Sequence, residues 1–509
     1  MWWLEPVDMA VGVVDQLEWY HFLIVGLDYV LKFVALGWVP QKRRPSSAMA
    51  WLLAIFLIPF IGILLFLMIG SPVVNRRRHK IQVQANALIR DMSSGEPDVP
   101  EGLDVTEGLD VTEEQLSMVQ LNRELTAMPA VGGTLRKLYS DYAESIREIA
   151  NAIDEAQHYV NVEIYIMAWD ETTDPFFQAL ARAADRGVKV RLMYDHVGSM
   201  KYPESHLLGR KLDRLGIEWY AMLPLKPWRW KFRRPDLRNH RKLVIIDGER
   251  AFMGSQNMID ASYLNSGNLK LGRQWVDIMG EFTGPIVSII NSVFAVDWYT
   301  ESGETLDLID PSVHAEQLAT AKKDTGAELM QLVPSGPGFT TEPNLRLFVS
   351  MAHHAKESLQ IVSPYFIPDE SLLEAVTTAA YRGVKVSLYV SEESDQMMVG
   401  HAQASYYEEL MESGVEIYQY PAPAVLHTKC AIADGEVAVM GSSNMDMRSF
   451  GLNYEITLMT FEGAVMDSLQ EIIDAYREAS LHLDLKEWKN RPRYKQYLDN
   501  VFRLTSALQ

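Results

Sequence analysis

Two segments of this 509-residue chain carry the same set of side chains able to do chemistry on an anion. Each segment contains a histidine, a lysine two positions later and an aspartate five positions after the lysine. These residues are His240, Lys242 and Asp247 in the first segment, and His427, Lys429 and Asp434 in the second. Both motifs are followed by Gly-Ser-x-Asn at the same distance, because the steps 427 − 240 and 444 − 257 are both 187. The repetition makes a chance match implausible.

The residues around each motif predict a β-hairpin that gathers polar side chains. Residues 242–246 have a strand pattern, so His240 and Lys242 project from the same face. Asp247-Gly248-Glu249-Arg250 predicts a two-residue turn of type II′, with Gly248 first. Cross-strand partners lie about 5 Å apart at Cβ, so each copy would cluster imidazole, ammonium, hydroxyl and amide groups. The predicted pairs are His240 with Asn257, Lys242 with Ser255, His427 with Asn444 and Lys429 with Ser442. A turn one residue longer would break this register.

Such a cluster suits a phosphodiester substrate. Imidazole can act as a nucleophile or an acid near neutral pH, while lysine and asparagine stabilise charge on the non-bridging oxygens. A lone buried histidine is more often a packing residue than a catalyst. Two copies with a lysine on the same face favour catalysis, because buried lysines need anionic partners. No second histidine stands at metal-ligand spacing near either motif, so we expect neither a metal nor a cofactor.

The overall charge restricts the partners of the chain. A formal net charge of −20 disfavours nucleic acid, and contact with an anionic lipid surface must therefore be local. Two segments are candidates for that contact: the basic and aromatic stretch 226–242, and the amphipathic tail 493–508. The tail could equally pack on the domain or lie on the membrane. Cys430 is the only cysteine, which excludes an intrachain disulfide and a cysteine-based zinc site.

The first 70 residues predict a membrane segment. Met49–Ile69 is a run of 21 residues without a charge, long enough to cross a hydrocarbon core of about 30 Å. Phe22–Val39 is the weaker candidate, since Asp28 and Lys32 interrupt it, although their spacing lets them pair on one helix face. Basic clusters follow both segments. The positive-inside rule then favours a cytoplasmic catalytic part, with the second segment re-entrant near Pro59.

A second repeat defines the domains. RGVKV occurs at 186–190 and at 382–386, each time after an alanine-rich helical pattern, which predicts helix, glycine turn and buried strand. We expect two copies of one α/β domain about a pseudo-twofold axis. EGLDVT occurs twice at 101–112, within an acidic spacer. The predicted division is a membrane segment with two hydrophobic helices at 1–80, an acidic linker at 81–130, the first copy at 131–300, a connector at 301–330, the second copy at 331–482 and an amphipathic tail at 483–509.

The doubled His-x-Lys-x4-Asp motif resembles the signature of the phospholipase D superfamily. Nearly the whole chain is similar to bacterial cardiolipin synthases, in the segments KRRPSSAMAWLL, GRQWVDIMGEFTGP, PSGPGF, PYFIPDESLL and LNYEITL. The resemblance implies two phospholipase D-like domains, each a mixed β-sheet flanked by helices. It also implies the inner membrane of a bacterium as location and phosphatidylglycerol and cardiolipin as lipid partners, with a possible homo-oligomer, no nucleic acid and no cofactor.

The resemblance also implies roles for individual residues. One histidine of the family forms a covalent phosphatidyl intermediate, usually the first, which carries to His240. His427 then protonates the leaving alcohol and later acts as base. An acidic residue on each imidazole matches Asp277 and Glu455, which leaves Asp247 and Asp434 mainly structural.

The implied reaction is transfer between two phosphatidylglycerol molecules, giving cardiolipin and glycerol. A hydrolytic phospholipase D or another phosphatidyltransferase is the alternative. Membrane anchoring and acidity disfavour a nuclease, and the two intact motifs disfavour an inactive scaffold.

Chelating agents are expected to leave the chemical step intact, because Lys242, Lys429, Asn257 and Asn444 stabilise the charge that a metal would otherwise hold. The measurement is the rate of lipid turnover with and without EDTA, with lipid aggregation controlled. A loss of activity that one specific divalent ion restores would contradict the expectation.

Overall fold

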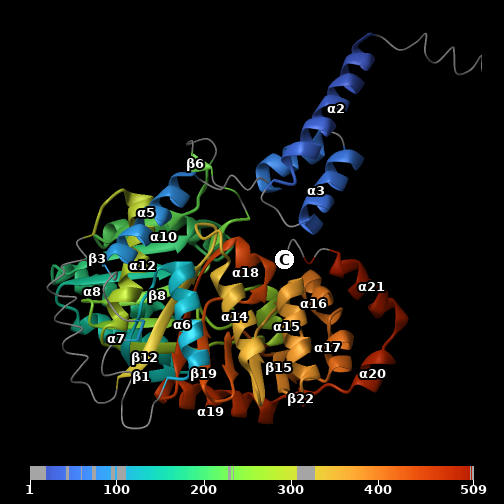
Figure 1. The fold of residues 1–509 in the computed structure, drawn as a ribbon. Helices are drawn as coiled ribbons and strands as arrows, with labels where there is room; N and C mark the ends of the chain where they lie inside the picture. Colours follow the sequence, from blue (N-terminus) through green and yellow to red (C-terminus); the bar gives the residue numbers. More distant parts are fainter. Residues whose placement is uncertain are drawn as a thin grey trace, which may run out of the picture. The chain divides into compact units, whose positions relative to one another are not determined.

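The computed structural model describes residues 19–41, 45–58, 60–70, 76–92, 98–99, 111–226, 231–232, 234, 236–306, 327–504 and 506. They belong to two compact units, Met1–Arg76 and Arg77–Gln509. The first unit contains the apolar segments, and the second contains both repeated domains (Figure 1).

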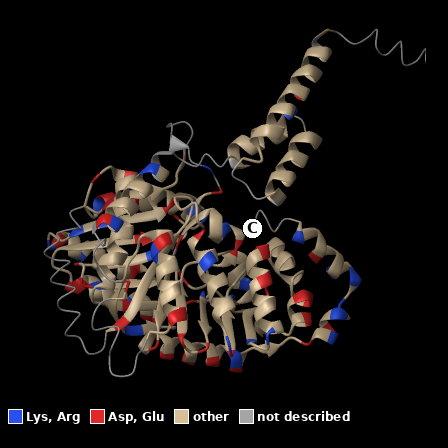
Figure 2. Ribbon diagram, in the orientation of Figure 1, with Lys and Arg blue, Asp and Glu red and all other residues tan. Residues whose placement is uncertain are grey.

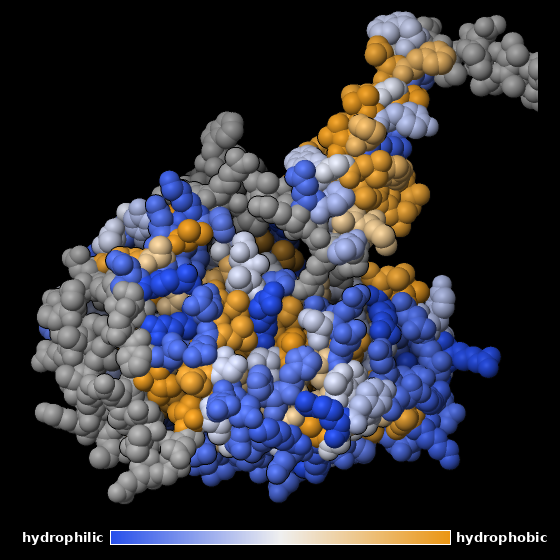
Figure 3. All heavy atoms as spheres, in the orientation of Figure 1, coloured by the Kyte–Doolittle hydropathy of each residue, from blue (hydrophilic) through white to orange (hydrophobic). Residues whose placement is uncertain are grey.

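The N-terminal unit contains one helix that is long and apolar enough to cross a membrane, among the residues described. This helix is α2 (Trp19–Trp38), and the window that qualifies is His21–Trp38. Asp28 and Lys32 form an ion pair of 2.6 Å on it, as their spacing predicts. Hydrophobic side chains cover most of its surface (Figure 3). The segment that the sequence ranked as the weaker span is therefore the stronger one.

Met49–Ile69, which is long enough for one span, does not form one continuous helix. The chain forms α3 (Pro45–Leu57), then the short helix α4 (Ile61–Leu65) and a π-helical turn η1 (Phe66–Gly70). Phe60 adopts a left-handed φ of 60° between α3 and α4. A Cβ on Gly62 would lie 2.5 Å from the carbonyl oxygen of Ala54, so this glycine permits close packing against α3. The break is compatible with a re-entrant segment, which stays a prediction.

The repeated domains join edge to edge in one continuous 16-stranded sheet, in which fifteen strands follow one another and the short strand β7 (Arg238–Asn239) pairs separately with β21. The first copy contributes, from the centre outward, β1 (Ala130–Tyr139), β11 (Met279–Thr283), β9 (Arg250–Gly254), β8 (Lys242–Ile246), β2 (Tyr159–Ile164), β3 (Lys189–Asp195) and β4 (Glu218–Met222). The second copy repeats this order with β12 (Glu328–Ser335), β21 (Asn453–Phe461), β19 (Val437–Gly441), β18 (Cys430–Ala433), β13 (Ser358–Val362), β15 (Lys385–Ser391), β16 (Glu416–Tyr420) and the edge strand β22 (Leu481–His482). The antiparallel pair β1–β12 joins the halves. The predicted duplication is confirmed.

Helices cover both faces of the sheet because the buried strands are apolar on both sides. Val244 and Ile246 of β8 pack with α7 (Tyr142–Glu155) and α8 (Asp174–Asp185). The alternate residues Leu243 and Ile245 pack on the opposite face with α12 (Ile286–Ser302). In the second copy, α14 (Pro343–His354) and α15 (Glu370–Tyr381) cover one face, and α19 (Ala464–Ala479) shares a single core with α12. That shared core ties the two halves together.

Much of the predicted linker at 81–130 is helical, which corrects the expectation. Helix α5 (Arg76–Met92) extends into it as far as Met92, and α6 (Glu113–Thr126) begins with a capping box between Thr112 and Gln115. Met118 and Val119 of α6 are buried in the core of the second copy. The EGLDVT repeat lies mostly outside the described residues, as does 307–326 of the connector.

Short helices and strands complete the catalytic unit, and several of them lie at the junction between the halves. The helices are α9 (His196–Met200), α10 (Ser205–Arg214), α11 (Ser266–Leu271), α16 (Met397–Ala404), α17 (Tyr407–Ser413), α18 (Met447–Gly451), α20 (Leu485–Lys489) and α21 (Arg493–Arg503). The short strands are β5 (Leu225–Lys226), β6 (Lys231–Phe232), β7 (Arg238–Asn239), β10 (Trp275–Val276), β14 (Phe366–Ile367), β17 (Val425–Leu426) and β20 (Met445–Asp446).

The predicted hairpin register is wrong by one residue. Ile246 pairs with Arg250, so the turn has three residues rather than two, and Lys242 falls opposite Gly254 instead of Ser255. Asp247 and Gly248 adopt left-handed φ values of 52° and 72°. The second copy is the same: Ala433 pairs with Val437, and Asp434 and Gly435 have φ values of 55° and 68°. Aspartate tolerates this conformation because its short side chain bonds locally.

Replacing Gly254 by alanine is expected to destabilise the catalytic unit by about 1–3 kcal/mol and to lower activity. A Cβ there would lie 2.2 Å from the carbonyl oxygen of Ile278. In the second copy, a Cβ at Gly441 would lie 2.2 Å from the carbonyl oxygen of Ile456. Thermal unfolding and lipid turnover are the measurements. Gly451→Ala is the control, because its Cβ would meet only Glu342 at 3.9 Å. Equal unfolding temperatures for the Gly254 variant and the parent would refute the argument.

Candidate active site

A cavity of 690 Å³ lies where the two copies meet, and residues of both copies line it. Its lining includes His240 and Asn257 of the first copy and His427 and Asn444 of the second. The structure thus brings both predicted histidines and both predicted asparagines to a single site.

Short strands deliver each histidine to the opposite copy. Strand β7, just before His240, pairs in parallel with the start of β21, and the His240 N–H donates to the Tyr454 carbonyl at 2.8 Å. Strand β17, just before His427, pairs with β10, and the His427 N–H donates to the Val276 carbonyl at 2.8 Å. Strand β7 therefore brings His240 to the strand that contains Glu455, and β17 brings His427 to the strand that precedes Asp277.

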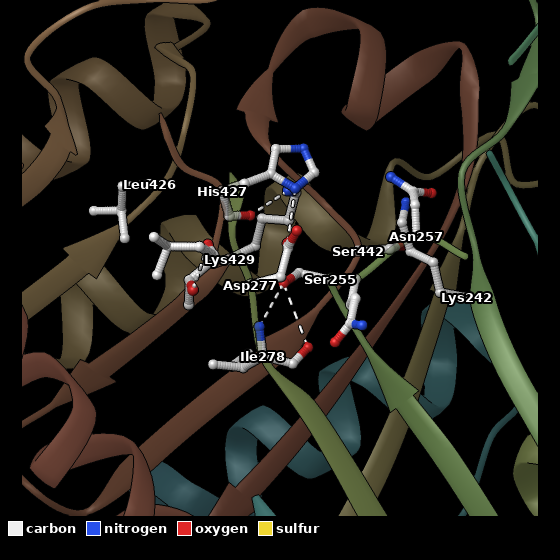
Figure 4. Close-up of polar contacts among 12 residues, drawn as sticks. Lys242, Ser255, Asn257, Asp277, Ile278, Leu426, His427, Lys429 and Ser442 are labelled. Carbon is white, nitrogen blue, oxygen red and sulfur yellow. Dashed lines mark hydrogen bonds and ion pairs between the residues drawn. The ribbon is translucent and has the colours of Figure 1, made fainter. Parts of the chain in front are cut away.

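Each imidazole is bonded to a carboxylate of the other copy. His240 Nδ1 lies 3.0 Å from Glu455 Oε2 and 3.0 Å from the carbonyl oxygen of Ser442. His427 Nδ1 lies 2.7 Å from Asp277 Oδ1 (Figure 4). Carbonyl and carboxylate oxygens only accept, so Nδ1 carries the proton and the neutral ring keeps its lone pair on Nε2. Asp277 and Glu455 each contact an imidazole, as the resemblance implied. The sequence did not indicate that each acid contacts the histidine of the other copy.

The two motif serines orient these carboxylates instead of joining the lysines. Ser255 Oγ donates to Asp277 Oδ1 at 2.6 Å, and Ser442 Oγ donates to Glu455 Oε2 at 2.5 Å. The one-residue shift of register explains the difference, because it moves each serine past its predicted lysine partner.

The two lysines are buried beneath the histidines. Lys242 Nζ donates to the carbonyl oxygen of His240 at 2.5 Å, and Lys429 Nζ donates to that of His427. Burial lowers the pKa of Lys242 to about 7 and that of Lys429 to about 8, against the partial compensation of Glu455 and Asp277. Near neutral pH the site therefore holds ammonium groups that can easily exchange a proton.

Burial also lowers the pKa of both histidines to about 4, although the carboxylates raise it in part. Burial alone would raise the pKa of Asp277 and Glu455, but the bonded histidines and the nearby lysines hold both below their usual values. We take the resting site at neutral pH as two neutral imidazoles, two carboxylates and the two lysines.

The two asparagines differ in their contacts. Asn257 Nδ2 donates to the Tyr263 hydroxyl at 2.7 Å, and its Oδ1 accepts from the Ile166 N–H at 3.1 Å. Asn444 lines the cavity, and its donor Nδ2 forms no hydrogen bond with any other residue that the structure describes. The Asn444 amide is thus the more available of the two for a phosphate oxygen.

Asp247 and Asp434 are not brought to the cavity. The Asp247 carboxylate accepts from the backbone N–H groups of 157–159 at 2.7–2.8 Å. Asp434 accepts from those of 356–358 at 2.7–2.8 Å. Both aspartates fix the hairpin turn to the start of a neighbouring strand, so the geometry gives them no contact with a substrate. Cys430 is a buried strand residue, and burial raises its pKa to about 12.

Sequence reasoning missed several residues of the site. The Tyr165 ring lies 4.7 Å from the His240 ring and 5.3 Å from Lys242 Nζ. Tyr165 and Tyr365 both line the cavity, and both lie shortly after the second strand of their copy. Arg238 and Arg448 also line it, and Arg238 pairs with the buried Asp195 at 3.2 Å. No local pattern marks these arginines. Trp228 and Trp230 of the basic stretch lie outside the described residues.

The family models match both the repeats and the N-terminal segment. Residues 149–275 and 348–477 match the model described as cardiolipin synthase, PLD-like domain. Residues 30–71 match the model described as phospholipase D-nuclease N-terminal. The fold and the site thus define a phospholipase D-like protein with two catalytic domains in one chain.

Curated relatives extend the similarity over nearly the full length. The chain is 32% identical to cardiolipin synthase A of Serratia proteamaculans (strain 568) over 486 residues, covering 96% of this chain and 98% of the relative. It is 32% identical to cardiolipin synthase A of Yersinia pseudotuberculosis serotype IB over 489 residues, covering 96% and 97%. The crystal structure of a phosphatidylserine synthase from Haemophilus influenzae Rd KW20 shares the fold, with a TM-score of 0.55, 13% identity and coverage of 77% of this chain and 99% of that one. This chain belongs to the cardiolipin synthase family of phospholipase D-like proteins.

Acidification from pH 6.5 to 4 is expected to destabilise the catalytic unit through His240 and His427. In the folded protein their pKa of about 4 lies below the ordinary value of 6.5, so the unfolded chain binds more protons between these pH values. The free energy of unfolding therefore decreases as the pH is lowered from 6.5 to 4. Thermal unfolding across the window is the measurement.

The variant His240→Asn/His427→Asn should show a smaller dependence of its unfolding temperature on pH than the parent. The control is His206→Asn, at an exposed position, which should keep the parent dependence. Equal dependence in all three proteins would contradict the burial argument.

Proposed function

We propose that this chain is a cardiolipin synthase that transfers the phosphatidyl group of one phosphatidylglycerol to a hydroxyl group of another, releasing glycerol. One observation carries the proposal: two imidazoles, each held by a carboxylate of the opposite copy, line one cavity with their Nε2 atoms unprotonated in the neutral state. One nucleophile and one proton carrier are what a two-step exchange at phosphorus requires.

In the first step, Nε2 of His240 attacks the phosphorus of phosphatidylglycerol. A nitrogen–phosphorus bond forms and the bond to the glycerol oxygen breaks, while His427 delivers a proton to that oxygen. His427 is neutral in the resting site, so it must take up this proton when the anionic phosphodiester binds and raises its pKa. Asp277 stabilises the imidazolium that results, and Lys242, Lys429 and Asn444 stabilise the charge on the non-bridging oxygens.

In the second step, the hydroxyl group of another phosphatidylglycerol replaces the departed glycerol. His427 now removes the hydroxyl proton, the new oxygen–phosphorus bond forms, and the bond to His240 breaks. His427 is then protonated again, as it was after phosphatidylglycerol bound. It releases this proton when cardiolipin leaves, so the enzyme returns to its resting protonation state with no net change of oxidation. Transfer to a lipid instead of water depends on positioning the acceptor, and well-oriented groups reach effective molarities of about 10⁵ M or more.

The N-terminal unit supports a membrane location, and we propose that the catalytic unit faces the cytoplasm of a bacterium. The sequence at 76–80 contains four basic residues, which positive-inside bias would keep in the cytoplasm. Domain boundaries near residues 130, 300 and 330 and a possible homo-oligomer belong to the same proposal.

Purified enzyme given phosphatidylglycerol vesicles alone is expected to form cardiolipin and free glycerol, without a nucleotide cofactor. His240→Ala and His427→Ala should each lower turnover by at least about 10³-fold, because nucleophile and acid are both needed in one cycle. Mass spectrometry of the lipids is the measurement, and Lys270→Ala, on the neighbouring helix α11, is the matched control.

Phosphatidate as the main product would indicate a hydrolase instead, and dependence on CDP-diacylglycerol would indicate a different synthase chemistry. His427→Ala is expected to accumulate a phosphatidyl adduct on His240 with an activated substrate. An adduct on His427 in the His240 variant would reverse the two roles.

A further inference from the structure

The C-terminal helix α21 presents an apolar stripe outward. Tyr494, Tyr497, Leu498 and Val501 follow the i, i+3, i+4, i+7 spacing of one helix face. Their side chains are exposed, by 64% and 70% for the two tyrosines. Leu504 at the end of the helix is also exposed. An amphipathic helix normally turns such a stripe towards the core, so this orientation requires an explanation.

The inward face of α21 is fixed by polar and aromatic contacts to α16, to α17 and to Arg491 just before the helix. Asp499 is buried and accepts from His401 Nδ1 at 2.8 Å, and it also pairs with Arg491 at 3.0 Å. The Phe502 ring stacks on the His401 ring at 5.4 Å. Arg503 pairs with Glu409 at 2.9 Å. These contacts define the rotation of the helix about its axis, so the apolar stripe faces outward because the opposite face is specifically bonded.

The segment that carries the stripe is locally basic in an acidic protein. Residues 486–503 contain six lysines and arginines and two acids, within a chain of net charge −20 (Figure 2). Arg493 and Lys495 flank the exposed tyrosines and form no ion pair with any other described side chain. Aromatic side chains beside unpaired cations are typical of helices that lie in the interface of an anionic bilayer.

Helix α16, on which α21 packs, also borders the cavity. Met398 and Val399 line the cavity, and Met397 and Met398 are exposed. On the other side of the lining, Met200 and Leu269 are exposed next to the lining residues Lys201 and Asn268. Large apolar side chains therefore border the opening through which a lipid must enter.

We propose that α21, with the exposed methionines of α16, is a docking surface for an anionic lipid bilayer that places the cavity opening against the membrane. This surface is distinct from the N-terminal helices: the latter tether the chain, whereas α21 orients the catalytic unit. The inference rests on the proposed function in one respect, namely that the substrate is a lipid of the bilayer. A bilayer is the occupant that we propose in preference to a second copy of the chain, because a basic surface complements anionic lipid.

The first test labels the stripe in the full-length protein. Cys430 is buried, so a cysteine introduced by Tyr497→Cys can be modified selectively with an environment-sensitive fluorophore. In proteoliposomes that contain phosphatidylglycerol and a spin-labelled lipid quencher, the probe at 497 is expected to shift to the blue and to be quenched. The matched control is Tyr381→Cys, on the exposed end of α15, where the tyrosine is 74% exposed and does not line the cavity. Equal quenching, or none, at the two positions would overturn the proposal.

The second test separates docking from chemistry. Tyr494→Ser/Tyr497→Ser is expected to lower turnover of long-chain phosphatidylglycerol in vesicles by about tenfold and to change turnover of monomeric dihexanoyl phosphatidylglycerol by less than about twofold. Tyr381→Ser should change neither rate. Equal losses on both substrates would assign the tyrosines to folding or catalysis, and loss of a dimer with unchanged vesicle kinetics would assign the surface to self-association. If the parent turns over neither substrate, the proposed function fails, whereas the quenching test stands independently.

Discussion

Four ionisable side chains are buried where the two halves of the sheet meet. The surrounding structure must supply each of them with an opposite charge or a hydrogen bond. Lys242, Lys429, Asp277 and Glu455 are each at most 3% exposed. A buried charge is tolerated only beside an opposite charge or strong hydrogen bonds, and removing one partner typically costs about 3–5 kcal/mol. The lysines come from one hairpin of each copy and the acids from the neighbouring segment. The acid that most favours the charged form of Lys242 is Glu455 of the second copy, and for Lys429 it is Asp277 of the first copy. The two copies therefore stabilise each other electrostatically as well as through their shared apolar core.

The exchange of acids between copies has a chemical consequence. Each carboxylate holds the Nδ1–H of a histidine from the opposite half, which leaves both Nε2 atoms available at the same cavity. The cavity is then chemically almost symmetric, and differences between the halves must come from the surrounding loops. Arg448 and Asp446 lie on the second copy, whereas the corresponding loop of the first copy carries Tyr263 in contact with Trp275. Unequal surroundings of this kind allow two nearly equivalent histidines to take different roles.

The sequence identified which histidines and asparagines come together better than it predicted their geometry. Duplication, strand positions and the glycine turn at 187 and 383 follow from local patterns, and the structure confirms them. The hairpin register failed because Asp247 takes a left-handed conformation, stabilised by three backbone N–H groups that are distant in sequence. The pairing of His240 with Glu455 could not be derived, since it depends on how two domains meet. The ranking of the membrane segments failed because hydropathy alone does not register the chain reversal at Phe60.

The most direct test of the central claim is a rapid-quench measurement of both half-reactions in two variants. The account predicts that Glu455→Gln slows formation of the phosphatidyl adduct on His240, because this carboxylate orients that imidazole from the other half. Asp277→Asn should instead slow protonation of the leaving glycerol and discharge to the acceptor, steps that depend on His427. If Asp277→Asn impairs nucleophilic attack by His240 while Glu455→Gln leaves it unchanged, each acid serves the histidine of its own copy and the account is contradicted.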